Sequence, residues 1–263
     1  MNITVFTSNQ PRHLSLIRDL ANIADRVFAI IEVNTVFPGK KSDFFKKTEV
    51  MQDYFSEVIA SEIKYFGNIS FLPNNVTPLI IKSGDLNDVN FNILKPALNS
   101  NEYIVFGASY IKGKLIDYLV EQGAYNIHMG VSPYYRGSSC NFWAAYDGNF
   151  DMVGATIHML SKGLDSGDML FHALPNIEQN PFDLGMRAVK SAHKGLVENI
   201  ANGNLKKFTK VKQDKKLEYR YTKNKDFTDE VAKGYLDNLP SIIDIEKSLS
   251  QRDMKKFLNP FIY

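Results

Sequence analysis

The chain of 263 residues is poor in several features that define special classes of protein. It has one cysteine, Cys140, so no disulfide can form within the chain, and a reducing compartment is expected. Its formal net charge is only +2, which falls well short of the basic surface of a nucleic-acid-binding protein. No stretch approaches the roughly 18 uninterrupted apolar residues of a membrane span, and the apolar run at residues 3–6 is too short for a cleavable signal. We therefore expect a soluble, cytoplasmic protein that binds neither nucleic acid nor membrane.

The composition that remains is that of an ordinary globular protein. Hydrophobic residues make up 44 % of the sequence and charged residues 23 %, so a packed core can form. The length allows one large domain, or one domain with a small appendage.

Short apolar runs alternate with amphipathic stretches over residues 1–205. The first 33 residues follow the order strand, helix, strand, and residues 27–33 are nearly all apolar, as in a buried parallel strand. This order predicts an α/β fold, a Rossmann-like open and mostly parallel sheet with flanking helices. Strands are predicted at residues 3–6, 27–33, 79–81, 103–106, 124–128, 152–159 and 169–173. Helices are predicted at residues 11–24, 48–65, 89–98, 112–122 and 181–202, and a loop at residues 34–47. The helix at 181–202 has Asn180 as its expected N-cap and Pro181 in its first turn.

The pattern changes near residue 205, which divides the chain into a main domain, 1–205, and a small C-terminal region, 206–263. Lysines alternate with apolar residues over 205–221 and predict a hairpin, and two helices are expected at 228–236 and 241–258. Six of these lysines form a basic cluster, which is first interpreted as the solvated face of the hairpin, with contact to RNA or phosphate as the alternative. They are Lys206, Lys207, Lys210, Lys212, Lys215 and Lys216.

Side chains that can carry chemistry gather between residues 125 and 168. Asn126 and His128 lie two apart on a predicted strand and so project to one face, where the strand gives way to a loop. In open parallel sheets this carboxyl edge is where ligands bind. Asp165 lies in a second, glycine-bearing loop. Taken singly, each has an ordinary structural explanation, such as a turn or a satisfied core histidine. Together they supply what acyl transfer to an amine needs: an oxyanion donor, a proton acceptor and an orienting anion.

The motifs of this stretch closely resemble those of the formyltransferases that use N10-formyltetrahydrofolate. That family includes methionyl-tRNA formyltransferases, glycinamide ribonucleotide transformylases and the sugar N-formyltransferases of surface-polysaccharide synthesis. The matching positions are Asn126/His128, residues 132–137, Trp143, Gly154/Thr156/His158 and Asp165/Gly167/Asp168. The loop departs from the family pattern because no leucine separates Ser132 from Pro133. The close resemblance covers about residues 100–175, and a looser one covers most of 1–205.

The resemblance implies that Asn126, His128 and Asp165 are the catalytic residues. Asn126 would donate an N–H to the oxyanion, and His128 would take the amine proton or brace the oxyanion. Asp165 would orient the imidazole and stabilise its charge, or relay the proton through water, so contact between His128 and Asp165 is predicted. A structural or indirect role is expected for His158.

The resemblance further implies N10-formyltetrahydrofolate as co-substrate, with its pterin held largely by backbone groups. The expected place is between the loop after the central strand and the loop that carries Asp165. The candidate residues are Phe106, Ala108, Tyr110, Ile111, Leu160 and Gly163. Core packing is the alternative for Phe106 and Tyr110. No metal is expected, since no cysteine–histidine spacing indicates zinc.

The acceptor is less closely defined. The turn after the first strand opens a helix, and a helix N-terminus favours phosphate. Asn9, Gln10 and Arg12 are therefore candidates to bind a nucleotide diphosphate, with a capped surface turn as the alternative. The turn lacks the glycines of glycinamide ribonucleotide transformylases, which argues against that acceptor. Tyr134, Tyr135 and Trp143 are expected to be exposed and to stack on a sugar or base, with core packing as the alternative for Trp143.

The C-terminal region is shorter than the barrel that follows the catalytic domain of methionyl-tRNA formyltransferases. It is more like the C-terminal parts of sugar N-formyltransferases, which often pair two subunits. The expected acceptor is thus a nucleotide-linked, dTDP-type amino-dideoxy sugar of a bacterial surface glycan, such as the O-antigen of lipopolysaccharide, and a homodimer is expected. The alternatives are a methionyl-tRNA formyltransferase-like enzyme, a formyltetrahydrofolate hydrolase, or a non-catalytic module that binds folate or nucleotide.

Overall fold

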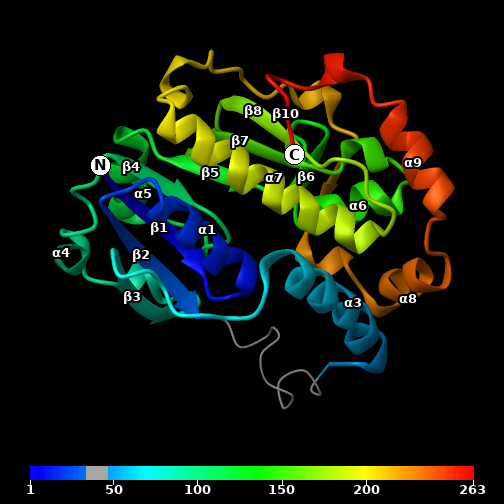
Figure 1. Cartoon of the computed structure of the whole chain (residues 1–263), viewed down its shortest axis with the longest axis horizontal. Coiled ribbons are helices and arrows are strands. Elements are labelled where there is room, and N and C mark those ends of the chain that lie inside the picture. Colours follow the sequence, from blue (N-terminus) through cyan, green and yellow to red (C-terminus); the bar gives the residue numbers. More distant parts are fainter. Residues whose placement is uncertain (34–46) are drawn as a thin grey trace.

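The fold is built on one eight-stranded sheet, in a computed structural model that describes residues 1–33 and 47–263 (Figure 1). Its strands are β1 (Asn2–Ser8), β2 (Arg26–Val33), β3 (Val76–Lys82), β4 (Glu102–Val105), β5 (Tyr125–His128), β7 (Ala155–Met159), β8 (Met169–Leu174) and β10 (Phe261–Ile262). In space they follow the order β10-β8-β7-β5-β4-β1-β2-β3. β7 runs antiparallel to β5 and β8, and the other neighbours are parallel. The predicted α/β fold with a mostly parallel sheet is confirmed.

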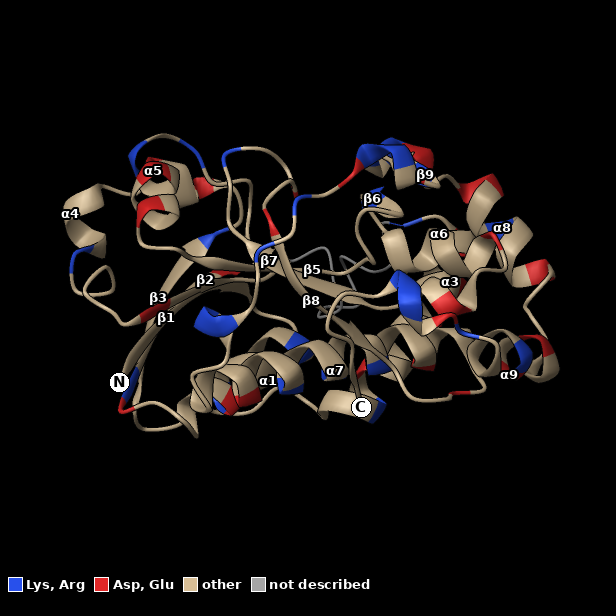
Figure 2. Cartoon of the chain, turned by 90° about the horizontal axis from the view of Figure 1, so that it is seen from above, with Lys and Arg blue, Asp and Glu red and all other residues tan. Residues whose placement is uncertain are grey.

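Helices cover both faces of this sheet. The helices in the described residues are α1 (Pro11–Ala21), α3 (Glu49–Phe66), α4 (Phe91–Leu94), α5 (Gly113–Glu121), α6 (Cys140–Tyr146), α7 (Pro181–Ala201), α8 (Asp229–Asp237) and α9 (Ile242–Ser250). Figure 2 shows α1 and α7 on one face and α5 on the other. The apolar core is divided accordingly. Leu20 and Leu196 lie in the layer next to α1 and α7, Leu119 lies in the layer next to α5, and Trp143 and Ile245 lie in a third cluster among α3, α6, α8 and α9.

The observed ends of the helices test the boundaries that were predicted from local sequence signals. The side chain of Asn180 accepts hydrogen bonds from the N–H groups of Phe182 and Asp183, so the predicted N-cap of α7 is confirmed. The helix predicted at 89–98 is wrong in extent, because α4 has only four residues and ends before Pro96, which cannot continue a helix. The helix predicted at 241–258 ends at Ser250, and Asp253 caps a separate turn instead.

The C-terminal region departs from the prediction. Residues 205–221 form no hairpin but two short 3₁₀ turns, and the pairing partners come from elsewhere in the chain. Val211 forms an antiparallel bridge with Met169, and β9 (Arg220–Thr222) pairs in parallel with β6 (Tyr135–Gly137). The alternation of lysines and apolar residues in this segment therefore reflects a segment that runs along other elements. It does not fold back on itself as a hairpin. All six lysines of the basic cluster are exposed.

Two of the expectations are tested only in part by the described residues. The loop predicted at residues 34–47 lies outside the described residues except for Lys47. Within the described part of the chain, the helices are too short or too polar to cross a bilayer. The division at residue 205 stays a prediction.

Candidate active site

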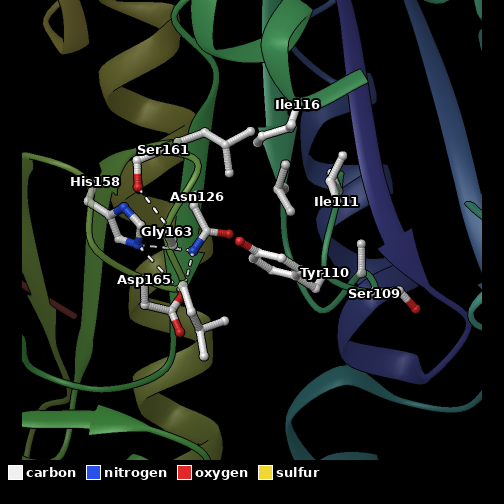
Figure 3. A pocket seen from close by; sticks show the side chains of 13 residues that line it. Ser109, Tyr110, Ile111, Ile116, Asn126, His158, Ser161, Gly163 and Asp165 are labelled. Atoms are coloured by element: carbon white, nitrogen blue, oxygen red, sulfur yellow. Dashed lines mark hydrogen bonds and ion pairs between the residues drawn. The ribbon is translucent and has the colours of Figure 1, made fainter. Parts of the chain in front are cut away.

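Two antiparallel strands and the loop between β7 and β8 bring the predicted catalytic side chains together. Asn126 of β5 is the register partner of His158 of β7, and His128 ends β5 two residues later. Because β7 is antiparallel, its end lies beside the start of β5. The loop that follows β7 must therefore fold back toward β5, and this places Asp165 against Asn126 and His158 (Figure 3).

Asp165 contacts both polar residues of β5. Its Oδ2 lies 3.3 Å from Nδ1 of His128, and its Oδ1 accepts a hydrogen bond of 3.1 Å from Nδ2 of Asn126. The predicted contact between His128 and Asp165 is confirmed.

His158 holds Asn126 from the other side. Its Nδ1 lies 2.8 Å from the carbonyl oxygen of Met159, which can only accept, so Nδ1 carries a hydrogen. In the neutral ring Nε2 is then an acceptor, and it receives a 3.0 Å hydrogen bond from Nδ2 of Asn126. Both N–H groups of Asn126 are thus engaged, and its amide oxygen points toward Tyr110 (Figure 3).

The far side of His128 is closed by Cys140, which the sequence analysis does not connect with the site. Its Sγ lies 3.5 Å from Nε2 of His128, and both side chains are buried. A Cβ at Gly130 would lie 2.5 Å from Cβ of Cys140 and 2.8 Å from Nε2 of His128. A glycine is therefore required at residue 130 for these two groups to meet.

The environment fixes the charges of the His128–Asp165 pair. Burial alone would lower the pKa of His128, but Asp165 and Cys140 outweigh it and raise the pKa well above 6.5. Burial would raise the pKa of Asp165, but His128 prevails and holds that pKa well below its usual value of 3.8. At neutral pH the pair is an imidazolium and a carboxylate.

A cavity of about 120 Å³ opens beside Asn126 and Asp165. It is lined by Val105, Ala108, Ser109, Tyr110, Ile111, Ile116, Asn126, His158, Leu160, Ser161, Gly163, Leu164 and Asp165. Five of the six residues predicted to contact folate are among them. Phe106 is not, because its ring packs in the core against His13 and His193, at 4.8 and 5.1 Å between ring centres. His128 does not line the cavity either, since it lies behind Asp165.

The loop on one side of this cavity forms hydrogen bonds with polar side chains of neighbouring segments. The buried carboxylate of Glu32 accepts hydrogen bonds from the N–H groups of Gly84 and Ser109. Asn87 donates to the carbonyl oxygen of Tyr110 at 2.9 Å and accepts from the N–H of Lys112 at 2.7 Å. The backbone at residues 107–112 is therefore fixed before any ligand arrives.

A second cavity has a volume of about 190 Å³. Its walls include Met129, which follows His128 in the sequence, and Asn141, which follows Cys140. The remaining lining residues are Arg12, Tyr54, Val58, Phe142, Ala145, Pro181, Phe182, Gly185, Met186, Val189 and Tyr235. The cavity is therefore largely aromatic and apolar, with one cationic side chain.

The three predicted phosphate-binding residues lie at the start of α1. Arg12 reaches the second cavity, and its Nη1 forms an ion pair of 2.9 Å with the buried Glu62. Gln10 is buried and accepts a hydrogen bond from Arg12, and Asn9 accepts one from Ser8.

Residues 101–200, which contain all three predicted catalytic residues, match the family profile described as Formyl transferase. This segment belongs to the formyl transferase family. A methionyl-tRNA formyltransferase of Caldicellulosiruptor saccharolyticus is 30 % identical over 148 residues, which are 56 % of this chain and 45 % of that relative. The chain therefore spans less than half the length of this curated relative.

Solved structures show the same fold. A sugar N-formyltransferase from a Shewanella species has a TM-score of 0.53 at 16 % identity, covering 95 % of this chain and 86 % of its own. An N-formyltransferase from Helicobacter canadensis, in complex with folinic acid and dTDP-3-aminofucose, has a TM-score of 0.50 at 13 % identity, covering 87 % of this chain and 73 % of its own.

The formyl transferase motifs outside the predicted catalytic positions have structural reasons. The hydroxyl of Thr156 accepts from the N–H of Ser132 at 2.8 Å and donates to the carbonyl oxygen of Gly130 at 2.7 Å. It thereby fixes the turn that follows His128. Arg136 forms an ion pair of 2.9 Å with Glu218, which ties the same loop to the C-terminal region.

The prediction that Tyr134 and Tyr135 are exposed is wrong. Their exposed fractions are 8 % and 1 %, and both pack in the third core cluster, which also contains Trp143. Their hydroxyl groups bond within the protein, that of Tyr134 to the carbonyl oxygen of Lys256 and that of Tyr135 to the Asp147 carboxylate. Neither ring lines the second cavity. Among the described residues, the structure holds no group of three or more His, Cys, Asp or Glu side chains suited to a metal ion.

His128 and His172, which both lie in this formyl transferase segment, are expected to titrate far apart. A ¹⁵N NMR titration should give His128 a midpoint above 6.5, and the stabilisation from its charge is fully present below about 6.5 and lost as the pH rises through that midpoint. His172 serves as the internal control, because burial lowers its pKa to about 4 with no carboxylate beside it. A midpoint for His128 below 6.5 would contradict the charged pair.

Proposed function

We propose that this protein is a sugar N-formyltransferase, which transfers the formyl group of N10-formyltetrahydrofolate to the amine of a nucleotide-linked amino sugar. The observation that carries the proposal is the cluster of Asn126, His128 and Asp165 beside the first cavity. The formyl transferase match over residues 101–200 supports the donor, and the likeness to sugar N-formyltransferase structures supports the acceptor. The cytoplasmic location and the dimer stay predictions.

The first cavity is suited to the donor's ring system. Ile111, Ile116 and Leu160 give it apolar walls for a flat ring, and the two loops that form it, residues 108–111 and 160–165, offer backbone groups to the ring's polar edge. When bound there, the donor supplies a formyl carbon that an amine can attack.

The reaction forms a bond between the acceptor nitrogen and the formyl carbon and breaks the bond from that carbon to the donor nitrogen. One proton leaves the acceptor and one joins the donor nitrogen. Negative charge develops on the formyl oxygen on the way, so a donor of hydrogen bonds is needed at that place.

Asn126 is the cavity-lining group that can stabilise this charge. Its two N–H groups are directed to His158 and Asp165, so the formyl oxygen must share or replace one of these bonds. The bond to Asp165 lies at the cavity wall. Loss of one such donor typically lowers the rate by about 10²–10³.

Asp165 is the anion that meets the attacking amine, and His128 keeps it charged. The carboxylate can accept a hydrogen bond from the amine and so orient its lone pair toward the formyl carbon. The imidazolium behind it balances the carboxylate charge, so the cavity wall does not repel the developing oxyanion. Since Asp165 is a weak base in this pair, the amine proton is expected to leave through water.

The second cavity is suited to the acceptor. Tyr54, Phe142 and Tyr235 provide rings on which a base can stack. Arg12, which Glu62 already pairs with and holds in place, is the cationic side chain in the wall that a diphosphate can meet. The complex of the Helicobacter canadensis protein with dTDP-3-aminofucose supports a dTDP-linked sugar as the first acceptor to test.

A methionyl-tRNA acceptor is the second candidate, because the curated sequence relatives are methionyl-tRNA formyltransferases. These matches span between 32 % and 56 % of this chain. Because they are partial, they argue for the reaction more strongly than for the acceptor.

The test is an acceptor screen with a formyl donor. The protein is incubated with N10-formyltetrahydrofolate and either dTDP-amino sugars, methionyl-tRNA or no acceptor. Tetrahydrofolate release is measured by absorbance and the formylated product by mass spectrometry. Release that depends on an amino sugar, together with a sugar one formyl group heavier, is the expected result.

The other outcomes each overturn the proposal in a defined way. Equal release without an acceptor would identify a hydrolase, and release only with methionyl-tRNA would identify the second candidate. Folate binding by calorimetry without release under any condition would identify a binding module.

A further inference from the structure

Gln213 of the C-terminal region bonds to the loop between β7 and β8 that carries Asp165, here called the catalytic loop. Its Nε2 donates a hydrogen bond of 2.8 Å to the carbonyl oxygen of Asp165 and another of 3.0 Å to that of Gly167. Both N–H groups of the amide are thus used on the backbone of the loop that carries the catalytic carboxylate.

The backbone of Asp165 needs such support. Its φ is +43°, in the left-handed region that side chains other than glycine rarely adopt. A residue persists there when its surroundings hold it. The two bonds from Gln213 fall on Asp165 itself and on the residue two positions later, so they brace the turn that aims the carboxylate.

The approach of Gln213 is fixed by the strand bridge just before it. The N–H of Met169 donates to the carbonyl oxygen of Val211 at 2.8 Å, and the N–H of Val211 donates back at 3.0 Å. Met169 is the first residue of β8, so the bridge attaches residue 211 to the main sheet at the end of the catalytic loop. Gln213 follows two residues later, opposite Asp165.

We propose that Gln213 is a positioning residue, which holds the carboxylate of Asp165 in the place where it meets His128 and Asn126. The region after residue 205 thereby completes an active site whose reacting groups all lie before it. This inference rests on the proposed function only for the role of Asp165 in turnover. The geometry of the His128–Asp165 pair can be followed without any substrate.

The test replaces Gln213 by methionine, which keeps the length of the side chain and removes both donors. Lys212→Met is the matched control, because the same residue is introduced at the neighbouring, exposed position. The pKa of His128 is followed by ¹⁵N NMR, and kcat and KM are measured with the best acceptor from the screen.

The expected result for Gln213→Met is a lower pKa of His128, because a displaced Asp165 no longer offsets burial. We also expect kcat to fall at least about tenfold while KM changes less, because orientation of the reacting groups is lost. Lys212→Met is expected to change none of these. A purely structural role would lower the melting temperature and leave the pKa of His128 unchanged in the folded variant.

An unchanged pKa of His128 in folded Gln213→Met would overturn the proposal. Should this variant not fold, Gln213→Ala carries the same test. A lowered pKa in a protein without formyl transfer would support the positioning role and reject the proposed function, so the two failures are distinguishable.

Discussion

Replacement of Asp165 by asparagine is expected to lower kcat for formyl transfer by at least about 10²-fold, because the group that orients the amine is lost. Asparagine tolerates the left-handed backbone at this position, so the substitution removes the charge with little cost to the turn. Without the carboxylate, only Cys140 still opposes the effect of burial on His128, so the pKa of His128 should fall. Because His128 can then become neutral, no unpaired charge is left buried. The free energy of unfolding should therefore fall only a little, while kcat falls strongly.

The measurement is kcat with the donor and the best acceptor, together with the ¹⁵N titration of His128. Asp117→Asn is the matched control, since Asp117 is an exposed carboxylate whose ion pair of 2.6 Å, with Lys162, holds the outside of the same loop. It should leave kcat within about twofold, as exposed ion pairs contribute little. Activity of Asp165→Asn within a few-fold of the wild type would remove Asp165 from the mechanism.

The sequence was most informative where spacing along one strand decides the geometry. Asn126 and His128 share a face because they lie two apart in β5, and this needs no knowledge of the rest of the fold. The N-cap at Asn180 is local in the same way. The contact between His128 and Asp165 was predicted from the family resemblance, since nothing in the spacing of residues so far apart requires it.

Features that depend on distant partners could not be predicted. The direction of β7 is set by its neighbours β5 and β8, and a strand's own residues do not state it. Tyr134 and Tyr135 lie in a polar loop motif and were therefore expected to be exposed, but α6 and the C-terminal region cover them. Cys140 and Gln213 carry no motif at all, because one acts through a side-chain contact with His128 and the other through backbone carbonyl groups.

Gly167, in the loop between β7 and β8, lies so close to β7 that one added methyl group should disrupt the loop. A Cβ at Gly167 would lie 1.7 Å from the carbonyl oxygen of Met159 and 3.0 Å from Nδ1 of His158. These are the two atoms whose hydrogen bond orients the His158 ring toward Asn126. The obstacle is strand backbone, so the loop has to move.

Gly167→Ala is therefore expected to lower the free energy of unfolding by about 1–3 kcal/mol. It should also lower kcat by about 10²-fold, because displacement of the loop by even about 1 Å takes Asp165 out of position. Urea unfolding and steady-state kinetics measure the two effects. The Gln213 bond to the carbonyl oxygen of residue 167 should weaken at the same time, which joins this prediction to the positioning role of Gln213.

Gly234→Ala is the matched control for the same substitution. Gly234 lies inside α8, and a Cβ there would meet nothing within 4 Å. Alanine should therefore stabilise the protein by roughly 0.4–1 kcal/mol and leave kcat unchanged. If Gly167→Ala behaved like Gly234→Ala, the loop would have room to spare, and the close approach of residue 167 to β7 could not be what aims the carboxylate of Asp165.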